Sequence, residues 1–241
     1  MPALVVALDF PEAAPALEMA KMLRGVTPWM KVGLELFTAA GPDLLARLKA
    51  IDCLVFLDLK FHDIPNTVAG AVAAAVRAGA DICNIHIDGG KRMARAAVEA
   101  KREALLRSGC MAAAKPDRAC LLLGVTVLTS SSPQEAGLSD RETLRELVRQ
   151  KALQAKDWGL DGVVCSGWEA NAIKQSCGKD FICLCPGIRP AGAELDDQQR
   201  VLTPAEAVAR GADFLVVGRP ITRAHDPLLA AQSIMDSMQE K

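Results

Sequence analysis

The feature that most constrains this chain is a regular alternation of short apolar runs with amphipathic, alanine-rich segments. Each of eight apolar runs is followed by one segment with helical spacing. The runs are almost continuously apolar, which is typical of parallel strands covered on both faces. The predicted strands are Leu4–Asp9, Trp29–Leu34, Cys53–Lys60, Asp81–His86, Cys120–Leu128, Gly162–Ser166, Phe181–Gly187 and Phe214–Gly218. The predicted helices span 12–24, 41–50, 67–78, 90–107, 141–157, 168–177, 204–210 and 227–239.

A short repeat supports this count. The motif Gly-x-Asp occurs between a predicted helix and the next strand at 79–81, 159–161 and 211–213, and glycine suits the left-handed residue just past a helix end. Eight units without a change in composition favour a closed (β/α)8 barrel, the TIM barrel, over an open sheet. No Gly-x-Gly-x-x-Gly follows the first strand, as a dinucleotide-binding fold would require. We therefore expect residues 1–241 to form one α/β domain, with surface loops at 108–118 and 130–140.

Composition excludes several classes of function. Half of the 241 residues are apolar, which is enough for a large core. The net charge of −1 gives no sign of a nucleic-acid or anionic-membrane surface. No apolar run has membrane-spanning length, and the N-terminus enters the first strand without a leader pattern. We expect a cytoplasmic protein that binds neither nucleic acid nor membrane.

The eight cysteines do not indicate disulfides or a metal site. None belongs to a Cys-x-x-Cys pair, and most lie within apolar runs. Cysteine in such runs behaves as a small buried hydrophobe. We expect reduced thiols, as is usual in the cytoplasm.

Charged residues interrupt the apolar pattern most sharply at the end of the third strand. The run from Val55 ends in Asp58, Lys60 and Asp63. Side chains alternate along a strand, so Asp58 and Lys60 should point the same way. Charges beside apolar residues are costly unless they pair. The spacing alone leaves two interpretations open, a salt bridge that ends the strand or a catalytic group.

Polar residues gather at the ends of other predicted strands too. In a barrel, the carboxyl ends of the strands form one rim, and catalysis takes place there. Two lysines and three aspartates at the same rim favour an active site over isolated surface charges. The polar residues expected there are Asp9, Lys31, Asp58, Lys60, Asp63, Asn84, His86, Asp88, Thr126, Thr129 and Ser166.

Two arginines indicate what the site binds. Gly218-Arg219 follows the eighth strand, where barrels commonly bind phosphate. Arg189 follows the seventh strand and could add a second, bidentate cation. The alternative is two arginines on a solvated surface. Histidines, cysteines and carboxylates show no metal-ligand spacing, so we expect no catalytic metal.

The third-strand segment Asp58-Leu-Lys60-Phe-His-Asp63-Ile-Pro-Asn-Thr67 resembles the signature of the bacterial-type orotidine 5′-phosphate decarboxylases. This resemblance implies a homodimeric TIM barrel that converts orotidine 5′-monophosphate to uridine 5′-monophosphate, the last step of pyrimidine nucleotide synthesis, without cofactor or metal. Further blocks in the family's order are Ala7-Leu8-Asp9, Lys31-Val-Gly33, Val125–Ser130, Pro186–Pro190 and Val217–Arg219.

The resemblance also implies roles for the charged residues. Lys60 would be the proton donor, and Asp58 and Lys31 would complete the charged array. Asp63 and Thr67 would reach into the partner subunit's site. These five residues are the expected catalytic group and its dimer contribution.

Other residues resemble the family's substrate ligands. Asp9 and Lys31 correspond to the ribose-hydroxyl contacts. Thr129 takes the hydroxyl position near the pyrimidine, with Thr126 as the alternative if that loop aligns differently. The residues that resemble the phosphate grip are Arg189, Gln198, Gly218 and Arg219, and Gln199 beside Gln198 leaves that assignment open.

Three other functions compete with this interpretation. Metal-dependent sugar-phosphate decarboxylases and hexulose-phosphate synthases share Asp-x-Lys-x-x-Asp, but they carry an acidic residue where this chain has Lys31. An aldolase would use Lys60 as a Schiff base, although neighbouring carboxylates keep an amine protonated. A catalytically inactive scaffold is the third alternative, and no residue of the matched motif is missing.

Overall fold

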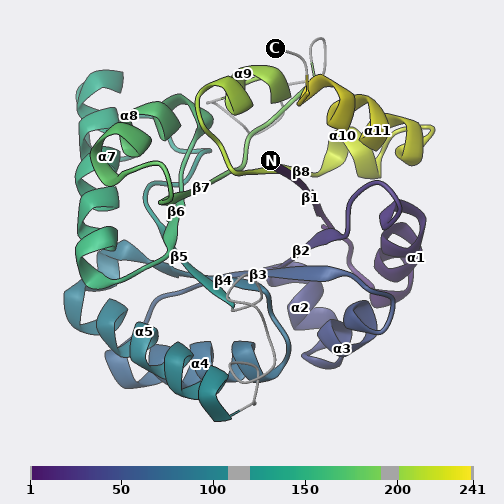
Figure 1. The fold of residues 1–241 in the computed structure, drawn as a ribbon, viewed down its shortest axis with the longest axis horizontal. Helices are drawn as coiled ribbons and strands as arrows, with labels where there is room; N and C mark the ends of the chain where they lie inside the picture. Colours follow the sequence, from purple (N-terminus) through teal and green to yellow (C-terminus); the bar gives the residue numbers. More distant parts are fainter. Residues whose placement is uncertain (1, 108–119, 191–200, 240–241) are drawn as a thin grey trace.

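The structure, a computed structural model, describes residues 2–107, 120–190 and 201–239. Eight parallel strands pair in chain order, and β8 pairs with β1 to close a barrel. Helices surround the ring of strands (Figure 1). The prediction of a (β/α)8 TIM barrel is confirmed. The strands are β1 (Ala3–Ala7), β2 (Trp29–Gly33), β3 (Leu54–Phe61), β4 (Ile82–His86), β5 (Leu121–Val125), β6 (Gly162–Val164), β7 (Ile182–Cys185) and β8 (Phe214–Val217).

The helices differ from expectation mainly at strand ends. They are α1 (Ala13–Leu23), α2 (Leu34–Ala40), α3 (Asp43–Lys49), α4 (Pro65–Arg77), η1 (Ile87–Gly89), α5 (Gly90–Arg107), α7 (Arg141–Trp158), α8 (Gly167–Cys177), α9 (Pro204–Ala209), α10 (Arg219–Thr222) and α11 (Pro227–Ser237). Helix α2 was not expected, because β2 passes into it at Gly33 without a polar loop. The short α10 and η1 were not expected either. The loop predicted at 130–140 is confirmed, and the one at 108–118 lies outside the described residues.

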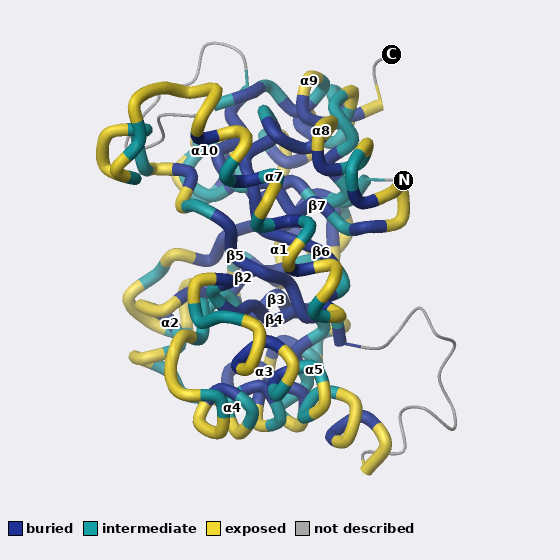
Figure 2. The backbone as a smooth tube through the Cα atoms, turned by 90° about the vertical axis from the view of Figure 1, so that its left-hand side faces the viewer, coloured by how far each residue is buried: buried dark blue, intermediate teal, exposed yellow. Residues whose placement is uncertain are grey.

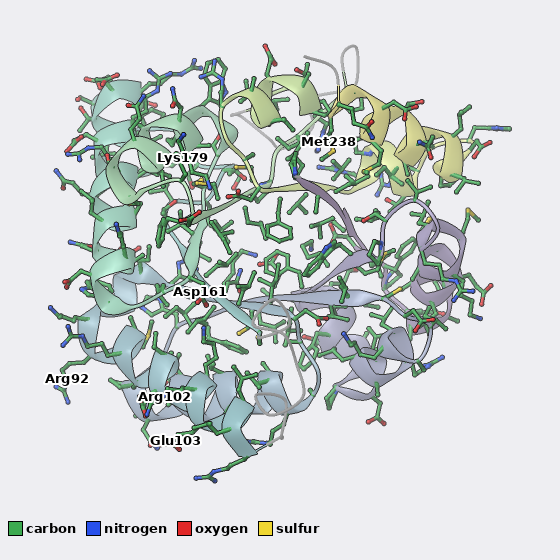
Figure 3. The ribbon with its side chains drawn as sticks, viewed as in Figure 1. Arg92, Arg102, Glu103, Asp161, Lys179 and Met238 are labelled. Carbon is green, nitrogen blue, oxygen red and sulfur yellow. The ribbon has the colours of Figure 1, made fainter. Side chains whose placement is uncertain are left out.

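Apolar side chains pack in two layers. Alternate strand residues such as Phe56, Leu123 and Val216 fill the barrel interior, and the intervening residues pack against the helices. Figure 2 shows the buried strands inside and the exposed residues on the outer helices. Arg92 and Glu103 on α5 lie on the outer side of the helical ring (Figure 3). Among the described helices, none combines the length and the apolar character that crossing a bilayer requires.

The seven described cysteines are free thiols, and all are buried. The Sγ atoms of Cys83 and Cys120 lie 3.9 Å apart, and those of Cys165 and Cys185 lie 4.0 Å apart, about twice the length of a disulfide bond. Burial raises the pKa of the Cys53 thiol, which keeps it protonated. For these seven, the predicted burial is confirmed.

The Gly-x-Asp repeat joins strands at the amino-terminal end of the barrel. Gly79 has a φ of +91°, as a residue past a helix end requires. The carboxylate of Asp81 accepts the backbone N–H of Val55 at 2.7 Å and the Nζ of Lys49 at 2.7 Å. The same arrangement recurs at Asp161 with Leu122 and Lys101, and at Asp213 with Cys183 and Lys174. Each aspartate therefore ties two strands and a helix together, at the end remote from the predicted site.

Replacing Asp81 with alanine should destabilise the barrel, because it leaves the buried N–H of Val55 and the ammonium of Lys49 without their acceptor. We expect a loss of about 2 kcal/mol in the free energy of unfolding, or roughly 4–8 °C in melting temperature. Thermal unfolding followed by circular dichroism measures it. The exposed Asp180 provides the control, and equal effects of Asp81→Ala and Asp180→Ala would contradict the structural role.

Candidate active site

A cavity of about 460 Å³ opens at the carboxyl ends of the strands. Its walls combine an apolar floor, including Phe56 and Val125, with a rim of polar and charged side chains. Eight of the residues predicted from the sequence line it, namely Asp9, Lys31, Asp58, Lys60, Thr129, Arg189, Gly218 and Arg219. The barrel thus brings residues from across the chain into one cavity.

Four charged side chains of alternating sign form an array along one wall. The Nζ of Lys31 donates to Asp9 Oδ1 at 2.8 Å and lies 3.7 Å from Asp58 Oδ2. The Nζ of Lys60 donates to Asp58 Oδ1 at 2.8 Å. Each carboxylate therefore contacts an ammonium, and Asp58 lies between two of them. This charge pairing is what permits ionised groups in a largely buried position.

The electrostatic state of Asp58 follows from these neighbours. Only 13% of its side chain is exposed, and burial by itself would raise its pKa. The charges of Lys31 and Lys60, with hydrogen bonds from Lys60 and Asn84, outweigh burial and hold the pKa of Asp58 below its ordinary value. Asp58 is therefore an ionised carboxylate at neutral pH.

The end of β3 is not a regular strand. The pairing of β3 with β4 shifts between Leu57 and Phe61, and Lys60 has a φ of +51°. This backbone region is uncommon for a residue with a side chain. Alternation along an ideal strand led us to expect Asp58 and Lys60 on one side. Their contact is confirmed, but the backbone that makes it is bulged.

A glycine makes room for the array. A Cβ at Gly33 would lie 2.9 Å from Lys31 Nζ and 3.4 Å from Asp9 Oδ1. No side chain fits there without displacing the ammonium. Gly33 ends β2, so the close approach lies at the rim itself.

The arginine side of the cavity lies at the ends of β7 and β8. Arg189 is buried, with 7% exposed, and its Nη1 donates to the carbonyl of Ile188 at 3.0 Å. Arg219 begins the short α10, and Gly218 precedes it. A Cβ at Gly218 would contact Ala7 at 3.4 Å, so β8 and β1 end close together. Both arginines line the same cavity as the charged array.

The two threonines near the end of β5 lie differently. Thr129 lines the cavity. Thr126 is buried and donates its hydroxyl to the carbonyl of Val164 at 2.9 Å. Of the two alternatives, only Thr129 is among the residues that line the cavity.

Two predicted residues are not part of this cavity wall. Asp63 and Thr67 are exposed and do not line it. The carboxylate of Asp63 accepts the backbone N–H of Ile64 at 2.6 Å. Gln198 lies outside the described residues, as does Gln199.

Other polar contacts at the rim were not predicted. Asn84 was expected at the rim, but its hydrogen bonds to β3 depend on the bulge, which has no local sequence signal. Lys151 of α7 donates to Asp88 and to the carbonyl of Thr126, at 2.7 and 3.0 Å. A lysine within a helix gives no hint of such a contact. Ser166, expected at the rim, follows β6 and caps α8 by accepting the Trp168 N–H at 3.4 Å. Within residues 2–107, 120–190 and 201–239, no three His, Cys, Asp or Glu side chains are grouped to hold a metal.

A closed α/β barrel with a charged cavity at the carboxyl ends of its strands defines a TIM-barrel enzyme site. The sequence profile of the orotidine 5′-phosphate decarboxylase / HUMPS family matches residues 2–234, and the chain belongs to this family. Proteins named orotidine 5′-phosphate decarboxylase from Nitratidesulfovibrio vulgaris and Maridesulfovibrio salexigens are 56% and 53% identical, each over 99% of this chain and 98% or more of their own. The crystal structure of orotidine 5′-phosphate decarboxylase from Lactobacillus acidophilus superposes with a TM-score of 0.80 at 34% identity, covering 99% of both chains. The family resemblance seen in the sequence motifs is confirmed, and with it the prediction of an enzyme.

The lowered pKa of Asp58 makes a prediction about stability against pH. Ionised Asp58 favours the folded state above the unfolded-state pKa of about 4, and this contribution disappears as the pH falls through the lower folded-state value. Asp58→Asn removes it. We expect the melting temperature of the wild-type protein, relative to the variant, to decline as the pH falls from about 5 to about 3.

Asp180→Asn is the matched control, because it removes an exposed carboxylate. Melting curves of the three proteins across this pH range give the comparison. A constant difference between wild type and Asp58→Asn would show that Asp58 has no lowered pKa.

Proposed function

We propose that this chain removes CO2 from orotidine 5′-monophosphate to give uridine 5′-monophosphate, with Lys60 as the proton donor and no cofactor. The observation that carries the proposal is the array of Asp9, Lys31, Asp58 and Lys60 inside one cavity. The names of its close relatives support the substrate.

The chemistry needs a fixed cation that can also deliver a proton. Breaking the bond between the ring carbon and the carboxylate leaves an electron pair on the pyrimidine. No adjacent carbonyl delocalises this pair, so the enzyme must stabilise it electrostatically. The ammonium of Lys60 supplies the charge and then the proton, and solvent later reprotonates the amine. Asp58, at 2.8 Å, orients the ammonium.

The remaining residues bind other parts of the substrate than the reacting carbon. Asp9 and Lys31 contact the ribose hydroxyls, and Thr129 lies near the pyrimidine. Arg189, Gln198, Gly218 and Arg219 bind the phosphate. Enzymes lower barriers by roughly 8–23 kcal/mol, which one ion pair does not supply. Remote binding energy that keeps the array in place is therefore part of the mechanism.

The position of Lys31 disfavours the metal-dependent alternative. Its ammonium lies between the carboxylates of Asp9 and Asp58, where a divalent cation would otherwise be attracted. The aldolase alternative is disfavoured by Asp58, because a carboxylate in contact with Lys60 stabilises the protonated amine. An aldolase needs the neutral amine as its nucleophile.

We also propose a cytoplasmic homodimer of one-domain chains, residues 1–241, in which Asp63 and Thr67 complete the partner's site. Both are exposed and lie outside the cavity wall of their own chain. Ile64, beside Asp63, is 67% exposed, and Leu34 at the cavity mouth is 58% exposed. Apolar side chains this exposed around an active-site rim fit coverage by a second subunit.

Purified protein should convert orotidine 5′-monophosphate in excess EDTA, because the proposed chemistry uses only side chains. The absorbance change on decarboxylation measures the rate. Lys60→Ala should lower turnover at least about 10³-fold, since it removes both the cation and the proton donor.

Lys91→Ala is the matched control, because Lys91 pairs with Asp157 away from the cavity. Circular dichroism should show the same fold for both variants. A strict metal requirement, or near-normal activity of Lys60→Ala, would overturn the mechanism.

Mixing Lys60→Ala with Asp63→Ala chains should restore activity if Asp63 acts in the partner's site. In a two-fold dimer, each mixed dimer then contains one intact site. A 1:1 mixture after exchange should recover roughly a quarter of wild-type activity. Native mass spectrometry shows whether the subunits have exchanged.

The control mixes wild-type chains with the Lys60→Ala/Asp63→Ala double variant. If Asp63 acts in trans, about a quarter of all sites stay active after exchange, and if it acts within its own chain about half do. No recovery in the first mixture together with half activity in the second would place Asp63 in its own site.

A further inference from the structure

The bulge at the end of β3 leaves a gap in the sheet. Leu57 pairs with Cys83 and Phe61 pairs with Ile85, so Asp58, Leu59 and Lys60 face Asn84 alone. These two strands are neighbours in the barrel (Figure 1). The three β3 residues cannot all form regular ladder hydrogen bonds with one residue of β4.

The side chain of Asn84 bridges this gap. Its Oδ1 accepts the backbone N–H of Lys60 at 2.8 Å, and its Nδ2 donates to Asp58 Oδ1 at 2.8 Å. A backbone N–H only donates and an ionised carboxylate only accepts, so chemistry itself fixes which end of the amide faces which partner. One side chain therefore holds the backbone of Lys60 and the carboxylate of Asp58.

Both contacts matter more because the site is buried and strained. Asn84 is 0% exposed, so a lost partner would not be replaced easily by water. Lys60 has a φ of +51°, a conformation that persists only where the surroundings enforce it. The Asn84 hydrogen bond holds that backbone at the residue whose ammonium meets Asp58.

We propose that Asn84 is a positioning residue for the decarboxylation, acting through Asp58 and Lys60 rather than on the substrate. This inference rests on the proposed function. Few other side chains fit the task. Leucine has a similar volume without polar atoms, serine and threonine offer only a short hydroxyl, and glutamine adds a methylene in a fully buried place. Aspartate keeps the acceptor for Lys60 but brings a second carboxylate against Asp58.

The test compares Asn84→Leu and Asn84→Asp with wild type in the full-length protein. Asn84→Leu should lower kcat by about 10²-fold with KM changed by less than about threefold, because the ligands of ribose and phosphate are untouched. Asn84 also helps to lower the pKa of Asp58. Loss of this hydrogen bond raises the pKa of Asp58. In Asn84→Leu, the acid limb of the pH profile of kcat/KM should therefore move to higher pH.

Asn84→Asp should show proton-dependent rescue. Two carboxylates in contact hold one proton between them, and a protonated Asp at position 84 would again donate to Asp58 while accepting from Lys60. Its activity relative to Asn84→Leu should rise as the pH is lowered. A purely structural role would not produce this dependence.

Cys83→Ala is the matched control, because Cys83 is the neighbouring buried residue of β4 and packs with the outer core. It should cost stability but leave kcat and the acid limb unchanged. Asn84→Leu with kcat within threefold of wild type, or with an unmoved acid limb, would overturn the proposal.

A crystal structure of Asn84→Leu separates this inference from the proposed function. Lys60 should leave its positive φ, and its Nζ should move away from Asp58. If the wild-type protein does not decarboxylate orotidine 5′-monophosphate, the function fails and the positioning is still judged by this geometry. An unchanged Lys60 backbone would overturn it.

Discussion

The contact of Asp58 with two lysines is the interaction on which the rest of the site depends. A carboxylate with 13% of its side chain exposed is costly to ionise unless cations surround it. Lys31 and Lys60 meet this need from two strands, and Asp9, which follows β1, pairs with Lys31. The two most buried charges, Lys31 and Asp58, each contact two partners of opposite sign. The array therefore acts as a unit, and its geometry is set by the spacing of strands in a closed barrel.

Polar residues at the two ends of the barrel have different roles, stabilising the fold at one end and forming the site at the other. At the amino-terminal end, Asp81, Asp161 and Asp213 each join two strands and a helix through hydrogen bonds that strengthen the fold. At the carboxyl end, the positive φ of Lys60 and the packed charges work against stability. These three aspartates lie far from the cavity, so their hydrogen bonds stabilise the barrel without restricting the shape of the site.

The strand count and the rim could be read from the sequence because apolar runs and Gly-x-Asp turns are local signals. Helix α2 was missed since β2 runs into it through apolar residues with no intervening loop. The bulge at Lys60 was missed for a different reason. Left-handed backbone is usually marked by glycine, whereas here a lysine is held there by the tertiary hydrogen bond that its backbone N–H donates to Asn84 Oδ1. Such a conformation has no signature until the neighbouring strand is placed.

That tertiary origin links the bulge to catalysis. A regular strand would place Asp58 and Lys60 on one face, but each residue would keep its own ladder hydrogen bonds and neither would depend on the other. In the bulged strand, the side-chain amide of Asn84 accepts the Lys60 backbone N–H and donates to the Asp58 carboxylate. The Nζ of Lys60 donates to the same carboxylate at 2.8 Å, so the three residues form a closed set of hydrogen bonds. A displacement of Asn84, Lys60 or Asp58 would therefore displace the other two. The ammonium is thereby held in place before substrate binds, and reorganisation that would otherwise add to the barrier is already complete.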